Sequence, residues 1–377
     1  MNVYQAALNR LSLIFNEYDS VLVSFSGGKD SGVLLNLCYD FAKENGFLHK
    51  LAMYHMDYEA QYSYTTDYVT RTFERFNDIR RFWLCLPVGA NCGCKMDNSV
   101  WIPWHKPDKA LWCRTIPKLP YVIHEDNCPF AVEVGKQDYS VQDDFCDWFA
   151  GQYGKTAVMI GIRAEESLER QKLIRMVDWI VGKDKQAHKV YPIYDWKTSD
   201  VWVANAKMAW DYNCIYDLFY KAGLTINQMR VANPFHTCGL NNLKLYRVIE
   251  PQTWSKLLNR VNGVNFGRIY GGTSAVAFKN LTKPSHFTWE QYAVFLVETS
   301  FPQARDNYRR KITEFVSKWK RQGYPDGIPD EADYFMEKKR DVPSWRRVCK
   351  CILTNDFACK GLGFSQGKVD ISCLEWA

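Results

Sequence analysis

The sequence contains no run of about 18 apolar residues, which is the length that a membrane-spanning helix requires. We therefore expect no membrane span in its 377 residues. The first ten residues, MNVYQAALNR, also lack the apolar core and the small-residue cleavage site of a secretory signal peptide. These two absences together favour a cytoplasmic protein.

The sequence also lacks the paired C-x-x-C spacing that would strongly indicate a zinc or iron–sulfur site. It nevertheless has thirteen cysteines, and without an export signal these are expected to be reduced thiols. Nine of them fall into two groups along the chain, namely Cys85, Cys92, Cys94, Cys113 and Cys128, and then Cys349, Cys351, Cys359 and Cys373. Buried, unreactive cysteines are the commoner explanation, and a metal site is the alternative.

Charge is nearly balanced over most of the chain, which excludes a uniformly basic or acidic protein. The net charge is +6, and residues 301–350 hold 13 Lys and Arg against 8 Asp and Glu. Within this segment, helical spacing predicts a buried stripe of Tyr308, Ile312, Phe315 and Trp319. The basic residues on the other side are then a solvated face or, as the alternative, a surface for nucleic acid or an acidic partner.

Strands alternate with helices over roughly the first 215 residues. Apolar runs predict strands at 21–25, 51–56, 81–88 and 157–162, and helical patterns cover 3–17, 30–45 and 65–76. This alternation favours a doubly wound parallel sheet in a domain of residues 1–215. A stretch rich in Cys, Trp and Pro, about 89–150, is predicted to be an insertion. Residues 216–377 are predicted to form a mostly helical C-terminal domain.

The sequence has no Walker motif, because the G-x-x-x-x-G-K-[ST] spacing is absent. Instead, Ser26–Ser31 reads S-G-G-K-D-S between a predicted strand and a predicted helix. Two glycines permit a tight turn, and the unpaired amides at a helix N-terminus attract an anion. Lys29 adds positive charge, and Asp30 is a candidate Mg²⁺ ligand or helix cap. The alternative is a capped helix without a ligand.

This motif resembles the signature of the PP-loop ATP pyrophosphatase superfamily, whose members bind ATP, release pyrophosphate and pass AMP to an acceptor. The resemblance implies an adenine nucleotide alpha hydrolase-like, Rossmann-like fold. It also implies nucleotide contacts from Ser24, Ser26, Gly27, Gly28, Lys29, Asp30 and Ser31.

A second segment narrows the resemblance. Residues 160–170, I-G-I-R-A-E-E-S-L-E-R, follow a predicted strand and resemble the G-x-R-x-x-E-S-x-x-R pattern of the phosphoadenylylsulfate (PAPS) reductase branch. The matching positions are Gly161, Arg163, Glu166, Ser167 and Arg170. An arginine at the end of such a strand can grip phosphate or sulfate through two N–H groups. A surface helix start with Glu–Arg pairs is the alternative explanation.

The same resemblance assigns further roles. It places Asp57 near the nucleotide, Arg114 and Lys118 near a substrate anion, and Lys29, Asp30 and Arg163 in catalysis. The whole chain resembles the IbrA-like (DUF3440) group of PAPS-reductase-like proteins. These are described as gene-expression co-activators that are associated with a ParB-like partner.

One feature departs from the reductases, which use a nucleophilic cysteine in a C-terminal E-C-G-L-H motif. Here Cys373 lacks the following glycine and histidine, and the Cys-Gly-Leu at 238–240 is followed by Asn241. We therefore do not expect reductase activity. The expected reaction uses ATP or a sulfonucleotide with Mg²⁺, adenylates an acceptor and releases pyrophosphate. A nucleotide-binding regulator without turnover and sulfur transfer to a nucleic acid are the alternatives.

Overall fold

The computed structural model describes residues 2–94, 100–166, 170, 179–182, 184–236, 240–261, 281, 283–300, 302–353, 356 and 359–364. The chain forms two compact units. The first consists of Met1–Val88 and Pro103–Ala232, and the second of Gly89–Ile102 and Asn233–Ala377. The sheet unit therefore extends beyond the expected residue 215. Only residues 89–102 of the expected 89–150 insertion belong to the other unit.

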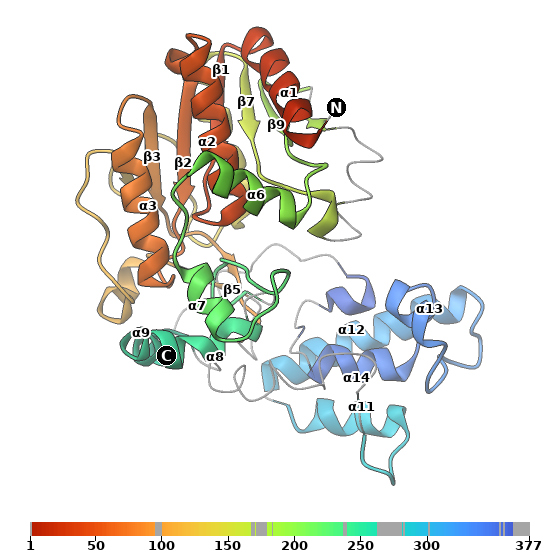
Figure 1. Cartoon of the computed structure of the whole chain (residues 1–377). Helices are drawn as coiled ribbons and strands as arrows, with labels where there is room; N and C mark the ends of the chain where they lie inside the picture. The colour runs from red at the N-terminus through yellow and green to blue at the C-terminus, as the bar shows by residue number, and fades with distance from the viewer. Residues whose placement is uncertain are drawn as a thin grey trace. The chain divides into compact units, whose positions relative to one another are not determined.

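The first unit contains a seven-stranded sheet in the order β6-β3-β2-β1-β7-β9-β8. Its strands are β1 (Ser20–Ser24), β2 (Leu51–Met56), β3 (Arg80–Cys85), β6 (Val122–His124), β7 (Thr156–Met159), β8 (Ile180–Val181) and β9 (Ala187–Val190). Neighbouring strands are parallel, except that β8 runs antiparallel to β9. The strand order reverses beside β1, with β2 on one side and β7 on the other (Figure 1). This arrangement confirms the predicted doubly wound α/β fold.

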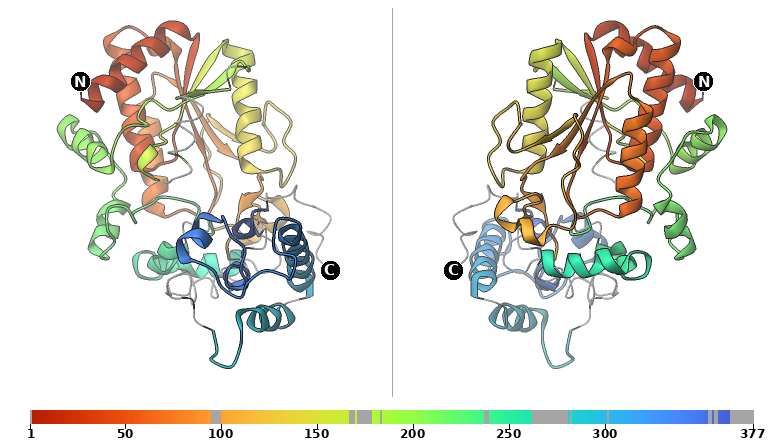
Figure 2. Two further views of the ribbon diagram at one scale, coloured as in Figure 1. Left: turned by 90° about the vertical axis from the view of Figure 1, so that its right-hand side faces the viewer. Right: turned by 90° about the vertical axis from the view of Figure 1, so that its left-hand side faces the viewer.

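Helices cover both faces of the sheet (Figure 2). One face packs against α1 (Val3–Glu17), α2 (Lys29–Glu44), α3 (Ser63–Arg75) and α6 (Thr198–Met208), and the other against α4 (Asp138–Tyr153). Successive residues of a strand point to opposite faces. Accordingly, Val21 and Val23 of β1 belong to the core under α2, whereas Leu22 belongs to the core under α4.

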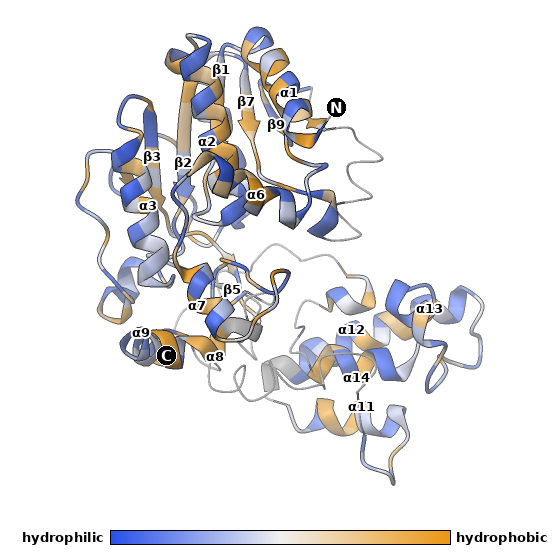
Figure 3. Cartoon of the chain, in the orientation of Figure 1, coloured by the Kyte–Doolittle hydropathy of each residue, from blue (hydrophilic) through white to orange (hydrophobic). Residues whose placement is uncertain are grey.

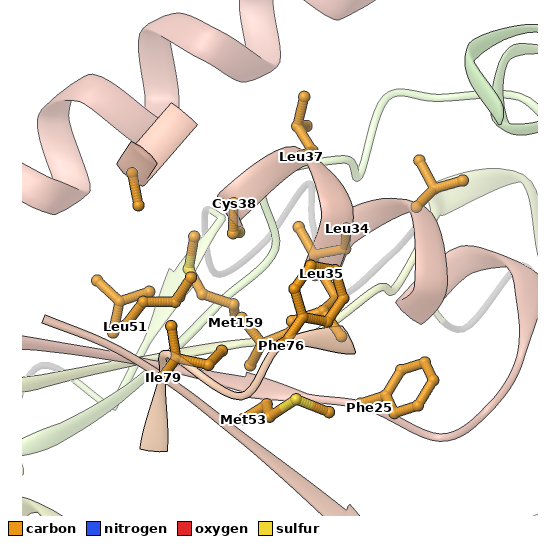
Figure 4. Packing of buried hydrophobic residues seen from close by; sticks show 14 of the residues in the cluster. Phe25, Leu34, Leu35, Leu37, Cys38, Leu51, Met53, Phe76, Ile79 and Met159 are labelled. Carbon is orange, nitrogen blue, oxygen red and sulfur yellow. The ribbon is translucent and has the colours of Figure 1, made fainter. Parts of the chain in front are cut away.

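Burial on both faces explains why the strands are continuous apolar runs in the sequence. Figure 4 shows how α2 packs, with Leu34, Leu35 and Cys38 in the same buried cluster as Met53 of β2 and Met159 of β7. In Figure 3, apolar colour runs along β7 and alternates with polar colour around α1 and α2. The amphipathic pattern of these helices therefore matches their position on the sheet.

The helix α4 lies in the stretch that we predicted to be an insertion. Its Phe145 and Phe149, one turn apart, contact Phe82 of β3 with ring centroids 5.5 and 5.7 Å away. The strand β6 lies in the same stretch and forms the edge of the sheet. Residues 103–150 are thus part of the sheet unit.

The second unit is mostly helical, as predicted. Its helices are α8 (Leu240–Ile249), α9 (Pro251–Arg260), α11 (Trp289–Glu298), α12 (Pro302–Arg321), α13 (Tyr334–Lys339) and α14 (Trp345–Leu353). Tyr308, Ile312 and Phe315 of α12 are buried against α11 and α14, which confirms the predicted apolar stripe. No helix in the described ranges combines the length and the apolar character needed to cross a bilayer.

A two-stranded hairpin of β4 (Ala90–Asn91) and β5 (Val100–Trp101) also belongs to the second unit. Trp101 meets the ring of Phe235 edge-on at 4.7 Å, and the Gly93 amide donates to the Phe235 carbonyl at 2.7 Å. Arg260 of α9 donates to the Ile102 carbonyl at 2.8 Å. These contacts tie a segment from early in the chain to the helices of the later part.

Candidate nucleotide site

The loop between β1 and α2 has the features of an anion-binding loop at a helix N-terminus. Ser24 ends β1, and α2 begins at Lys29 with Gly28 as an N-cap that makes no side-chain capping bond. Gly27 adopts a φ of 75°, which favours glycine. A Cβ at Gly27 would also lie 3.0 Å from methyl groups of Thr65 and Val69 on α3. The loop therefore needs glycine for both conformation and space.

Two hydroxyl groups, one at each end of the motif, are hydrogen-bonded to each other across this loop. The Ser26 and Ser31 Oγ atoms are 2.9 Å apart, and Ser31 Oγ also accepts from the Ser26 amide at 3.1 Å. No residue that the structure describes accepts a hydrogen bond from the amides of Asp30 and Ser31. The first turn of α2 thus keeps backbone donors available for an anion.

Three of the predicted site residues meet beside this loop. Arg163, only 2% exposed, follows β7, and its Nε donates to Asp30 Oδ1 at 2.7 Å. Lys29 Nζ donates to Asp30 Oδ2 at 2.9 Å. The carboxylate of Asp30 therefore joins two cations at the start of α2. Each oxygen of Asp30, the candidate Mg²⁺ ligand, thus accepts a hydrogen bond from a cationic side chain.

Gly161 lets the strand β7 approach the start of α2. A Cβ at Gly161 would lie 3.1 Å from the Asp30 carbonyl carbon and 3.1 Å from the Ser31 nitrogen. The backbone after β7 is thus packed directly on the backbone of the phosphate loop. This close approach is what places Arg163 within reach of Asp30.

Two glutamates surround Arg163. Glu165 Oε2 accepts from Arg163 Nη1 at 3.1 Å and from the backbone amide of Thr198 at 2.7 Å, at the start of α6. The Thr198 amide, followed by the Thr198 hydroxyl and Arg163, lowers the pKa of Glu165. Glu166 lies 3.8 Å from Arg163 Nε and also pairs with Arg170. Glu165 was not predicted as a site residue, and the predicted Ser167 lies outside the described residues.

Asp57 lies just beyond the end of β2, where it is fully buried. Its carboxylate accepts hydrogen bonds from Arg114 Nη2 and, at 2.6 Å, from the indole N–H of Trp83. Burial alone would raise the pKa of Asp57, but Arg114 and His55 outweigh it and lower the pKa below the ordinary value. The arginine that we expected to hold a substrate anion is thus paired with the aspartate that we expected near the nucleotide. Lys118 is exposed.

His55 sits in β2 two residues before Asp57. Its Nδ1 lies 2.8 Å from the Phe25 carbonyl oxygen, and its buried Nε2 has no partner among the described residues. Burial lowers the pKa of His55 below its ordinary value. The unfolded chain therefore takes up a proton on this imidazole at a higher pH, about 6.5, than the folded chain does.

This difference predicts a pH-dependent stability. Because the unfolded state binds the extra proton, stability is full above about pH 6.5 and falls below it, by at most ~1.4 kcal/mol per pH unit. Urea unfolding between pH 7.5 and 5.5 should show a shallower slope for His55→Asn than for the wild type. His49→Asn, at an exposed position, is the control and should keep the wild-type slope. Equal slopes for His55→Asn and the wild type would contradict the prediction.

Two family descriptions match the sequence in succession. Residues 149–223 match "Phosphoadenosine phosphosulfate reductase domain", and residues 223–325 and 324–372 match "Domain of unknown function (DUF3440)". The uncharacterized protein YbdN of Escherichia coli K12 is 32% identical over 382 residues, covering 98% of this chain and 92% of YbdN. The chain belongs to this PAPS reductase-like, DUF3440-containing family.

Two solved structures show a weaker likeness. The PAPS reductase of Candida auris, in a phosphate complex, is 15% identical with a TM-score of 0.33, covering 60% of this chain and 87% of the reductase. The FMN adenylyltransferase of Candida glabrata is also 15% identical with a TM-score of 0.33. The match covers 56% of this chain and 58% of the adenylyltransferase, which is less than two thirds of its length.

In this family member, two residues that contact the loop between β1 and α2 lie outside the sequence motifs. Asn213 is fully buried, and its Nδ2 donates to the Gly27 carbonyl at 3.0 Å and to Thr65 Oγ1 at 2.9 Å. The hydroxyl of Tyr216, on α7 (Ile215–Lys221), accepts from the Lys29 amide at 3.0 Å. Both lie far along the chain from the loop in a segment without a recognisable pattern, so only the fold reveals them.

The cysteines do not form a metal site in the part of the chain that the structure describes, where no group of three or more potential ligands converges. Cys85, Cys113 and Cys128 belong to the sheet unit, whereas Cys92 and Cys94 belong to the other unit. Burial raises the pKa of Cys85 well above that of an ordinary thiol, which makes it unreactive. Cys238 and Cys373 lie outside the described residues.

Proposed function

We propose that the chain binds ATP or a related adenine nucleotide with its phosphates at Ser26–Ser31. We further propose that it cleaves ATP at the α-phosphate. An acceptor oxygen would bond to the α-phosphorus while the bond to pyrophosphate breaks. The observation that carries this proposal is the glycine loop with available amides beside the Lys29–Asp30–Arg163 cluster. The family membership agrees with it.

The side chains have distinct parts in this proposal. Lys29 would turn from Asp30 toward the phosphates and neutralise the charge that develops on the departing pyrophosphate. Arg163 is held by Asp30 and Glu165, so its guanidinium is oriented before the ligand arrives. Magnesium would arrive bound to the phosphates, and the turn of Lys29 would free Asp30 Oδ2 to help hold it. No step in the proposal depends on a metal–protein bond.

Calorimetric titration with ATP and with PAPS, in the presence of Mg²⁺, tests the binding half of the proposal. Lys29→Ala is expected to weaken ATP binding by roughly ten- to hundredfold, because a charge-assisted contact contributes about 1.5–3 kcal/mol. Arg163→Ala should weaken it at least as much. Lys43→Ala, at an exposed position on the same helix, is the matched control and should bind like the wild type. Unchanged binding in both site variants would show that the site is wrongly assigned.

A pyrophosphate assay on the same samples tests the catalytic half. Release of pyrophosphate by the wild type, with the release lost in Lys29→Ala, supports an adenylating enzyme. Binding without release, even with candidate acceptors and partners added, would favour the second candidate described next.

The second candidate is a nucleotide-binding regulator that does not turn over. Five basic side chains of α12 and α13 are exposed and form no ion pair with any described carboxylate. They are Lys318, Lys320, Arg321, Lys338 and Lys339. On α13, Phe335 is 68% exposed and lies three and four residues before Lys338 and Lys339. Free cations next to an exposed aromatic ring suit a phosphate-rich partner such as DNA. In this candidate the chain would act with DNA or with a ParB-like protein.

A further inference from the structure

The side chain of Tyr216 reaches the phosphate loop from a distant part of the sequence. Its hydroxyl oxygen accepts from the amide of Lys29, the first residue of α2, at 3.0 Å. The same oxygen lies 3.5 Å from the position that a Cβ would take at Gly28. Tyr216 therefore touches the loop where its backbone amides are concentrated.

The position of this tyrosine is fixed by its surroundings. The backbone amide of Tyr216 donates to the Asn213 carbonyl at 3.1 Å, and Asn213 itself holds the Gly27 carbonyl. The ring is almost completely buried and meets the edges of Trp202 and Phe219 at 5.3 and 6.2 Å. A side chain packed in this way loses little further entropy when it contacts a ligand.

The proton of the hydroxyl has no acceptor among the described residues. A phenol can donate one hydrogen bond and accept others, and here the oxygen serves as the acceptor for the Lys29 amide. Burial, and then the charge of Asp30, raise the pKa of Tyr216 far above its ordinary value. The group therefore keeps its proton at every physiological pH and remains a hydrogen-bond donor.

Lys29 approaches the same ring. Its Nζ lies 5.7 Å from the ring centroid while it bonds Asp30. An anion in the loop would thus meet the lysine charge and the tyrosine hydroxyl side by side. Neither the S-G-G-K-D-S motif nor the segment after β7 contains this tyrosine.

We propose that Tyr216 donates a hydrogen bond to a phosphate oxygen of the nucleotide bound at Ser26–Ser31, which makes it a phosphate-binding residue supplied by α7. This inference rests on the proposed nucleotide site and adds a contact to it. The contact recognises the phosphate chain and not the adenosine part of the ligand.

Tyr216→Phe removes the hydroxyl and keeps the ring, so it tests the contact. Tyr220→Phe is the matched control, because Tyr220 lies on the same helix and is 71% exposed. We expect Tyr216→Phe to raise the Kd for ATP roughly ten- to hundredfold, as for other hydrogen bonds to a charged group. The Kd for adenosine should be unchanged. A general disturbance of the fold would weaken both ligands together.

The outcomes are separable. Tyr216→Phe binding ATP as tightly as the wild type would overturn the inference and leave the proposed site intact. Tighter binding would also overturn it, because it would mean that the hydroxyl occupies a position that a phosphate needs. A wild type that binds neither ATP nor PAPS would remove the proposed function, and the inference with it. Thermal unfolding of each variant establishes that the fold is retained.

Discussion

Replacing Arg114 with methionine is expected to lower the free energy of unfolding by about 3–5 kcal/mol, because the change removes the cation that pairs with a fully buried carboxylate. The change leaves the Asp57 carboxylate fully buried without its cation. The hydrogen bond from Trp83 and the backbone amide of Glu59 satisfy only part of its charge. Urea unfolding followed by tryptophan fluorescence measures the loss, since Trp83 and Trp104 lie against the pair.

Two further variants make this result specific. The double variant Asp57→Asn with Arg114→Met removes both charges and should recover much of the loss. Arg71→Met breaks a surface pair with Asp211, in which Arg71 is 46% exposed, and should cost no more than about 1 kcal/mol. If Arg114→Met costs no more than Arg71→Met, the Asp57–Arg114 pair contributes no more to stability than a surface ion pair does.

Gly161→Ala is expected to have the second large effect, on both stability and nucleotide binding. The added Cβ would press on the backbone of Asp30 and Ser31 at 3.1–3.2 Å, and a backbone in the first turn of a helix cannot yield cheaply. Such overpacking costs about 1–3 kcal/mol. The displaced loop should also bind ATP at least roughly tenfold more weakly, since 1.4 kcal/mol corresponds to a factor of ten.

The control for Gly161→Ala is another glycine of the same unit. A Cβ at Gly151, on α4, would meet nothing within 4 Å. Gly151→Ala should therefore stabilise the protein by up to about 1 kcal/mol, because alanine is the better helix former. Gly161→Ala behaving like Gly151→Ala in unfolding and in ATP titration would show that the approach of β7 to α2 is not tight.

Local patterns predicted much of the sheet unit. The runs at 51–56 and 157–162 became β2 and β7, and the helical patterns at 3–17 and 30–45 became α1 and α2. These elements have strong patterns because strands buried on both faces are continuously apolar and surface helices are amphipathic. The short strands β8 and β9 have only two and four residues, too few for a pattern to stand out.

Only those residues of the candidate site that belong to a sequence motif could be predicted from the sequence. The residues of Ser26–Ser31 and Arg163 stand in recognisable segments, and the structure brings them together. The pairing of Arg114 with Asp57 depends on the path of a loop after β3 that returns to the sheet. The spacing of residues along the sequence does not predict that path. The same holds for Asn213 and Tyr216, whose contacts with the loop cross more than 180 residues of sequence.

The discontinuous second unit has a consequence for synthesis of the chain. Residues 89–102 leave the ribosome about 130 residues before Asn233, where the rest of their unit begins. At typical elongation rates of 5–20 residues per second, this delay lasts roughly ten seconds. During that time Trp101 lacks Phe235, and the Ile102 carbonyl lacks Arg260. The packing of the hairpin in its unit can therefore be completed only after the chain has been made as far as Arg260.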